Sequence, residues 1–319
     1  MIILPTEQAE HIGEKLKKKY KSDFKYLSLG TNNDGKIEFA DREQYTNVRA
    51  IEQIDGEDVV VLHCAAPRPN SSTIRLYQTL DSLNNPQYSE GKKIVDGQEI
   101  KNYKPLGVKP KSIQVFFLYA PQCKQDWPDK TGSINAAKQV LDICKFYGTK
   151  RFFALDVHYE GEDWTKEYDI VYSSVIDLLM QEAVKDGYTD TVWVAPDGGM
   201  VRRAKKRGLD ILGMKKTRIN NTKTLIECPL HVREAVKGKR AGIVDDLLGT
   251  GGTMNQAGKA LLECDAGELI DCVPHLRLLE GYKRIQDIYA ETYTSNSIDN
   301  PRARVNVTDR VVETLHKHM

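Results

Sequence analysis

Residues 241–253 read Ala-Gly-Ile-Val-Asp-Asp-Leu-Leu-Gly-Thr-Gly-Gly-Thr, and they run directly into a segment with helical spacing of apolar residues. The apolar Ile243 and Val244 are typical of the end of a buried strand, and the small residues at 249–253 are typical of a tight turn. We therefore predict a strand, a loop and the N-terminus of a helix at this point of the chain.

Such a junction gathers unpaired backbone N–H groups and the positive end of a helix dipole, and glycines let an anion approach the main chain. Asp245 and Asp246 would be exposed at the strand end, where carboxylates accept hydrogen bonds from sugar hydroxyls or hold magnesium-bound water. An ordinary strand–helix turn with two solvated aspartates is the alternative. We favour a sugar-phosphate site, with the phosphate at Gly249, Thr250, Gly251, Gly252 and Thr253.

Length and composition exclude several protein classes. The chain has 319 residues, enough for two domains of similar size, and its 46 Lys and Arg against 45 Asp and Glu leave a net charge of +1. This balance does not favour nucleic-acid binding. The sequence has no apolar run long enough to span a membrane and no secretory signal, so we expect a cytoplasmic protein whose six scattered cysteines are buried thiols.

Apolar strands alternate with amphipathic helices along the chain, which predicts an α/β fold with mainly parallel sheets. Residues 58–63 and the helix after residue 70 repeat the order of strand, loop and helix, but without the double aspartate or the glycines. Residues 84–111 lack a sustained period, and we interpret them as an excursion compatible with a hairpin.

Polar residues follow three of these predicted strands. Ligands of parallel sheets lie beyond the carboxyl ends of the strands, where His158, Asp197 and the 245–246 pair all occur. The period of a strand places Asp156 on the same side as His158. Asp197 could alternatively serve only as a helix N-cap, and His158 only as a structural hydrogen-bonding residue.

Several motifs, in order and over nearly the whole chain, resemble those of the ribose-phosphate pyrophosphokinases. Residues 241–253 resemble the phosphoribosyl-pyrophosphate motif of type I phosphoribosyltransferases and their relatives. Residues 154–158, Ala-Leu-Asp-Val-His, resemble a strand end whose histidine binds magnesium–ATP, which implies that role for His158. Residues 195–199, Ala-Pro-Asp-Gly-Gly, resemble a diphosphate-binding loop, which implies that Asp197 is a ligand of Mg²⁺.

The resemblance also implies an ATP site. Residues 124–126 resemble the family's Arg-Gln-Asp, and residues 32–36 resemble an adenine loop that a neighbouring subunit supplies. It follows that the chain self-associates, with the ATP site near a subunit interface. ATP binding is thereby assigned to His158, Lys124, Gln125, Asp126, Asp34, Gly35 and Lys36.

Residues 215–218, Lys-Lys-Thr-Arg, resemble the start of the family's mobile catalytic loop. The likeness implies that Lys216 is the catalytic lysine and that Arg218 is its partner, which also binds ribose 5-phosphate. Lys215 lies one position off the pattern. A solvated charge run is the alternative for all three.

The chain departs from the family pattern at specific positions. The stacking phenylalanine of the adenine loop is replaced by Asn32, a glutamate by Lys36, and the arginine of the ATP motif by Lys124. Met200 occupies a glycine position of the diphosphate loop, and Gly249 an aspartate position of the sugar-phosphate motif. The ribose-phosphate side therefore follows the pattern more closely than the nucleotide side.

The resemblance implies two tandem phosphoribosyltransferase-like domains, residues 1–155 and 156–319, and a specific reaction. The diphosphoryl group of ATP would pass to the C1 hydroxyl of ribose 5-phosphate, giving phosphoribosyl pyrophosphate and AMP. Two alternatives stay open: a phosphoribosyltransferase that consumes the same compound, and a non-catalytic regulatory homologue that keeps the sugar-phosphate pocket.

Overall fold

The computed structural model describes residues 1–30, 46–218 and 224–319, which form two compact units. Unit 1 comprises Met1–Ala154 with Glu162–Val171, and unit 2 comprises Leu155–Gly161 with Tyr172–Met319. In the described part of the chain no helix is long and apolar enough to cross a membrane.

Unit 1 is built on a six-stranded sheet in the order β2-β1-β3-β6-β7-β8, whose strands from β2 to β7 pair in parallel. Its strands are β1 (Ile2–Pro5), β2 (Lys25–Tyr26), β3 (Asp58–Cys64), β6 (Ser112–Tyr119), β7 (Thr149–Leu155) and β8 (Ile170–Ser173). The helices are α1 (Glu10–Lys19), α2 (Pro69–Asn84) and α3 (Ala136–Phe146), with short 3₁₀ turns η1 (Glu7–Ala9), η2 (Ile51–Ile54) and η3 (Asp163–Glu167).

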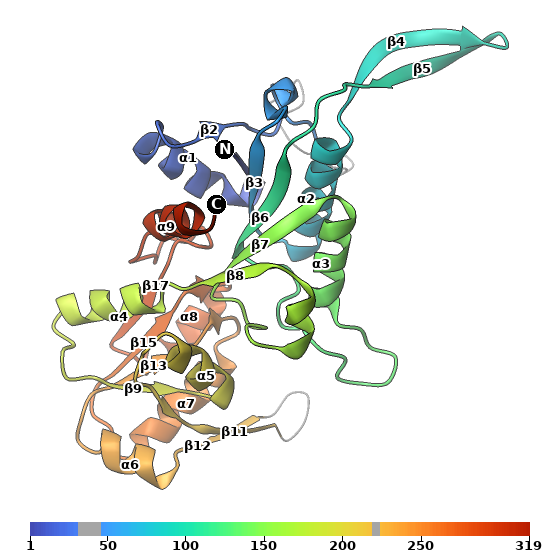
Figure 1. Ribbon diagram of the computed structural model, residues 1–319. Helices are drawn as coiled ribbons and strands as arrows, with labels where there is room; N and C mark the ends of the chain where they lie inside the picture. Colours follow the sequence, from blue (N-terminus) through green and yellow to red (C-terminus); the bar gives the residue numbers. More distant parts are fainter. Residues whose placement is uncertain (31–45, 219–223) are drawn as a thin grey trace. The chain divides into compact units, whose positions relative to one another are not determined.

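The excursion in unit 1 is a hairpin, as its composition indicated. Strands β4 (Gln87–Val95) and β5 (Gln98–Pro105) pair only with each other in an antiparallel ribbon. The ribbon extends away from the six-stranded sheet of its unit (Figure 1).

Unit 2 is built on a fully parallel five-stranded sheet in the order β10-β9-β13-β15-β17. Its strands are β9 (Val192–Ala195), β10 (Leu212–Gly213), β13 (Ala241–Val244), β15 (Leu269–Val273) and β17 (Glu291–Thr294). Smaller pairs are β11 (Lys215–Arg218) with β12 (Thr224–Glu227), antiparallel, and β14 (Leu247–Leu248) with β16 (His275–Leu276), parallel. The helices are α4 (Ile176–Lys185), α5 (Gly198–Lys206), α6 (Leu230–Val236), α7 (Gly252–Leu262), α8 (Leu279–Ile285) and α9 (Thr308–His318).

Both faces of this five-stranded sheet are covered by apolar packing. Ile243 of β13 belongs to a cluster with α7, whereas the next residue, Val244, belongs to a cluster with α4 and α5. Successive side chains of a strand point to opposite faces, so a strand buried on both faces reads as a continuous apolar run. The predicted α/β class, with two mainly parallel sheets flanked by helices, is confirmed. All six cysteines are free and buried, as expected.

Candidate functional site

The loop between β13 and α7 has the backbone of an anion site. Gly251 is the N-cap of α7 with a φ of 75°, in the left-handed region, and no side chain caps the helix. The first turn of a helix leaves N–H groups without intrahelical partners. The predicted loop residues 249–253 therefore surround uncapped donors at the positive end of a helix.

Close packing against α8 fixes the shape of this loop. A Cβ added to Gly251 would lie 2.6 Å from the carbonyl oxygen of Gly281, and a Cβ added to Gly281 would lie 1.9 Å from that of Gly249. Arg284 also donates from Nη1 to the carbonyl oxygen of Thr250 at 3.1 Å. Glycine is therefore required at 251 and 281 by backbone geometry, in addition to any requirement of a ligand.

The double aspartate is buried, which corrects the prediction of exposed carboxylates. Asp245 and Asp246 are 6% and 3% exposed. The amide of Asp246 donates to Oδ1 of Asp245 at 2.9 Å, so the first aspartate also shapes the strand end. Buried carboxylates need partners, because an unpaired charge away from water is costly. Substituting them would therefore affect stability as well as any ligand.

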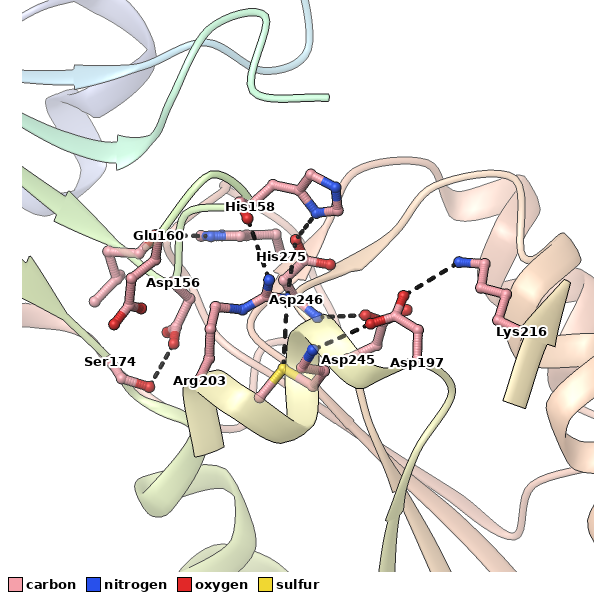
Figure 2. A network of polar contacts seen from close by, with 12 residues as sticks. Asp156, His158, Glu160, Ser174, Asp197, Arg203, Lys216, Asp245, Asp246 and His275 are labelled. Carbon is pink, nitrogen blue, oxygen red and sulfur yellow. Dashed lines mark hydrogen bonds and ion pairs between the residues drawn. The ribbon is translucent and has the colours of Figure 1, made fainter. Parts of the chain in front are cut away.

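His158 supplies one of those partners. Its Nδ1 lies 2.7 Å from Oδ2 of Asp246 (Figure 2). A carboxylate only accepts, so the proton of this bond is on Nδ1, and in the neutral ring Nε2 carries the lone pair. This carboxylate–histidine pair is the arrangement that orients histidines in metal and phosphate sites.

Asp156 does not share the side of His158, contrary to the strand period. Strand β7 ends at Leu155, and Asp156 has a φ of 42°, so the alternation stops there. Its carboxylate instead accepts hydrogen bonds from the hydroxyl of Ser174 and from the amide of Val175. Burial raises the pKa of Asp156 to about 6, against the opposing charge of Arg207. Asp156 therefore holds the loop that carries His158.

Arg203 connects the loops of the site. It is 7% exposed, and its Nη1 donates to the carbonyl oxygen of His158 at 3.1 Å while Nη2 lies 3.8 Å from Oδ2 of Asp246. The side chain projects from α5, which begins directly after Asp197. One buried guanidinium thus ties α5 to both the β7 loop and the end of β13.

Asp197 has two contacts, one of which is the helix cap, the alternative role considered for it from the sequence. Its Oδ1 accepts from the amide of Met200 at 3.1 Å, and its Oδ2 lies 3.4 Å from Nζ of Lys216. Burial alone would raise the pKa of Asp197, but the Met200 amide and the charges of Lys216 and Arg203 outweigh it, so the pKa is lowered. The carboxylate is therefore ionised and faces the lysine.

Strand β11 brings Lys216 to the site. Residues 215–218 pair with β12, which packs against α7, the helix that follows the sugar-phosphate loop. Alternation along the strand sends Lys215 to the opposite face from Lys216. The side chain of Arg218 lies outside the described part of the chain.

The donor set fits Mg²⁺ in the form that accompanies phosphates. No group of three or more His, Cys, Asp or Glu side chains among the described residues is placed to hold a metal. Mg²⁺ commonly takes one or two carboxylates and completes its shell with water and substrate phosphates. The ionised Asp197 meets this requirement.

Besides His158, the predicted ATP residues fall into two groups of three. Lys124, Gln125 and Asp126 lie in the turn before α3 of unit 1, where the carbonyl of Gln125 accepts from the amide of Ala137 at 3.0 Å. The other three, Asp34, Gly35 and Lys36, lie outside the described residues together with Asn32.

His275 was missed by the sequence reasoning. It is fully enclosed, and burial lowers its pKa to about 4. The Nε2 of the ring donates to the carbonyl oxygen of Leu155 at 3.1 Å, and Nδ1 lies 2.8 Å from the hydroxyl of Ser297. It therefore anchors the end of β7 just before the His158 loop. A single histidine after a strand gives no sequence signal for this role.

Several known proteins with related sequences are named ribose-phosphate pyrophosphokinase. Residues 175–308 match the phosphoribosyl transferase domain family. The chain is 24% identical over 277 residues to the ribose-phosphate pyrophosphokinase of Sulfolobus acidocaldarius, covering 85% of this chain and 86% of that protein. It is 26% identical over 216 residues to the ribose-phosphate pyrophosphokinase of Pyrococcus abyssi, covering 65% and 73%.

The fold has a solved counterpart. The structure is similar to the crystal structure of phosphoribosylpyrophosphate synthetase from Mycobacterium smegmatis, with a TM-score of 0.75, 20% identity and coverage of 99% of this chain and 97% of that one. At this identity the likeness establishes the shared fold.

Proposed function

Because the chain is a divergent relative of the ribose-phosphate pyrophosphokinases, we propose that it transfers the diphosphoryl group of ATP to the C1 hydroxyl of ribose 5-phosphate. The products would be phosphoribosyl pyrophosphate and AMP. The C1 oxygen attacks the β-phosphorus of ATP, the bond from that phosphorus to the α-phosphate oxygen breaks, and the hydroxyl proton leaves to solvent. Such chemistry depends mainly on positioning and on neutralising charge.

In this proposal, unit 2 binds ribose 5-phosphate. The 5-phosphate would bind the uncapped amides of residues 250–253. Asp245 and Asp246, at the adjoining strand end, would orient the ribose hydroxyls. The packing of Gly281 against the loop keeps these donors in position before the ligand arrives.

The nucleotide phosphates would lie between His158, Asp197 and Lys216. A bound Mg²⁺ would offset the negative charge of the phosphates. Asp197 would hold the ion, and His158 would contact the same metal–phosphate complex while Asp246 fixes its ring. Lys216 faces Asp197 now, and its ammonium group would move to the transferring phosphate when the substrates bind.

One observation carries the proposal. Motifs that lie far apart in the sequence meet in a single chain of contacts, from Lys216 to Asp197, through the first turns of α5 to Arg203, and on to Asp246 and His158 (Figure 2). A solvated charge run or an isolated helix cap would not require Lys216, Asp197 and His158 to belong to one chain of contacts that reaches Asp246.

The test is formation of both products. The full chain is incubated with ATP, ribose 5-phosphate and Mg²⁺, and ³¹P spectroscopy follows AMP and phosphoribosyl pyrophosphate. We expect the two products in equal amounts and only when ribose 5-phosphate is present. Release of ADP and inorganic phosphate instead, or no ribose-dependent turnover, would rule out this activity.

A second candidate rests on the replacements on the nucleotide side. With Asn32, Lys36 and Lys124 in place of the family residues, a homologue could bind ribose 5-phosphate and fail to use ATP. Calorimetry of ribose 5-phosphate binding together with the AMP assay separates the two candidates. A non-catalytic homologue would bind ribose 5-phosphate and release no AMP.

The self-association and the ATP site near a subunit interface, which the resemblance implies, belong to the same proposal.

A further inference from the structure

The β4–β5 hairpin is an arm whose side chains are exposed on both strands. Every residue of β4 is exposed, as is every residue of β5 except the half-buried Asn102. The turn is Asp96-Gly97, with positive φ at both residues, the geometry that joins tight hairpins. An isolated two-stranded hairpin is marginally stable in water, and three or more strands are normally needed. Among the residues that the structure describes, the arm therefore has no third strand that would stabilise it.

Large apolar side chains are concentrated on this arm. Ile94 is 77% exposed, Tyr103 is 55% exposed and Ile100 is 39% exposed. Strand β5 also forms an edge, because its recorded partner in the described residues is β4 alone. An exposed edge with apolar side chains pairs readily with another strand.

Charge within the arm is incompletely compensated. Lys101 lies directly opposite Lys92 in the ladder, and like charges in that position repel. Lys92 has a partner in Glu99, at 3.0 Å. No ion pair is recorded for Lys101 among the residues that the structure describes. A further carboxylate beside Lys101 would relieve this repulsion.

The sequence of β5 supplies that carboxylate when the strand is paired antiparallel with a copy of itself. Centred on Ile100, the pairing sets Glu99 of each copy opposite Lys101 of the other, and Asp96 opposite Lys104. It also sets Gln98 opposite Asn102 and brings the two Ile100 side chains together. Each charge within residues 96–104 then faces its opposite.

We propose that β5 is a self-association edge, through which two copies of this chain form a continuous four-stranded antiparallel sheet about a two-fold axis at Ile100. Along a β-strand, the backbone N–H and C=O groups of alternate residues point to opposite edges of the strand. This register pairs odd-numbered residues with odd-numbered ones, so paired residues point to the same edge. Outward-facing groups of one copy therefore meet those of the other. The contact is isologous, as two-fold symmetry requires. It does not depend on the proposed reaction.

A disulfide tests the register. Residues facing each other across an antiparallel pair have Cα atoms roughly 4.5–5.5 Å apart, within reach of a disulfide. Ile100→Cys should therefore form a covalent dimer of the full chain under mild oxidation. Gln98→Cys is the matched control on the same strand and face, because in this register it does not meet itself. The six native cysteines are buried, so background crosslinking should be low.

Charge reversal tests the pairing without a crosslink. Glu99→Lys or Lys101→Glu sets like charges opposite each other at both Glu99–Lys101 pairs of the dimer. Either change should weaken self-association by roughly tenfold. The double variant Glu99→Lys/Lys101→Glu restores opposite charges and should recover it. Lys93→Glu is the control, since it makes the same charge change on β4 and leaves the β5 edge intact.

Sedimentation velocity of the full chain reads out these variants. A monomeric wild type at all concentrations, a self-association indifferent to both single reversals, or equal crosslinking of Ile100→Cys and Gln98→Cys would each overturn the proposal. Failure of the double swap to recover the assembly would overturn the Glu99–Lys101 register.

Discussion

The two units contain the same order of strand, loop and helix, but their loops differ in the backbone N–H groups that they can offer to a ligand. In unit 2, Gly251 leads into α7 with its amides uncapped. In unit 1, Pro69 opens α2 and Pro67 precedes it, so two positions of that loop have no N–H to offer. The hydroxyl of Ser72 closes the turn by donating to the carbonyl oxygen of Ala65 at 3.1 Å. The first turn of α2 also has no side-chain cap, but its prolines leave this loop with fewer donors for an anion than the unit 2 loop.

The strand ends differ in the same way. Strand β13 leads into two buried carboxylates, one of which contacts His158. Near the end of β3 lies His63, which is fully buried and whose Nδ1 lies 3.0 Å from the hydroxyl of Thr6. Burial lowers the pKa of His63 to about 3, so the ring stays neutral. A shared element order thus fixes where a ligand could bind, and the residues at the strand end and loop decide whether one does.

The largest expected effect is on turnover at unit 2. Lys216→Ala should lower kcat by ~10²–10³, or about 3–4 kcal/mol, because a preorganised charge acts most strongly in the transition state. KM should change much less. Steady-state assay of AMP release measures both constants.

Lys215→Ala is the control for this effect, since Lys215 lies on the other face of β11. Equal, small losses in the two variants would mean that this segment is a solvated charge run.

A smaller effect is expected at Gly251, the glycine that is present in the unit 2 loop and absent from the unit 1 loop. Gly251→Ala should lower the free energy of unfolding by about 1–3 kcal/mol, because alanine is strained at a φ of 75°. It should also weaken ribose 5-phosphate binding, because the new Cβ would push against the carbonyl of Gly281. Urea unfolding and calorimetry give the two quantities.

Gly249→Ala is the matched variant in the same loop. No heavy atom lies within 4 Å of a Cβ at that position. If both alanines behave alike, the left-handed geometry at 251 is not what shapes the site.

The smallest effect is a difference in acid sensitivity between the units. With its pKa lowered from 6.5 to about 3, His63 makes unit 1 less stable as the pH falls below 6.5, since the unfolded chain then binds the proton. At 1.36 kcal/mol per pH unit, about 2 kcal/mol would be lost by pH 5.

In unit 2, burial raises the pKa of Asp156 to about 6 and that of Asp271 to about 7. As the pH falls, these two carboxyls change the stability of the unit in the opposite direction to His275, whose pKa is lowered. A carboxyl whose folded pKa is raised loses stability as the pH rises, so it gains as the pH falls toward 4. Hydrogen exchange at pH 7 and pH 5, corrected for intrinsic rates, should show unit 1 opening more easily at pH 5. His63→Gln should remove the difference, and a greater loss in unit 2 would reverse the assignment.

The sequence contained enough information for the alternating fold and the glycine loop. The run from Ile243 to Thr253 combines an apolar strand, a double aspartate and small residues, and each is a local signal. The hairpin was also accessible, because Asp96-Gly97 is a dipeptide that favours tight turns.

Long-range contacts were not accessible from local pattern. Buried Asp246 has partners far along the chain, Arg203 and His158. Asp156 leaves the strand period because it adopts a left-handed backbone conformation directly after β7. No neighbouring glycine in the sequence indicates this change. Two-residue strands such as β14 and β16 carry no period at all.

The most direct test of the central claim is the footprint of ribose 5-phosphate on the two loops. Hydrogen exchange of the full chain, with and without the sugar phosphate, should show slowed amides at residues 250–255 and no change at residues 65–73. Gly251→Ala should reduce the protection at the same ligand concentration. Protection at residues 65–73, or none at residues 250–255 at saturating ligand, would contradict the assignment of the sugar-phosphate site to unit 2.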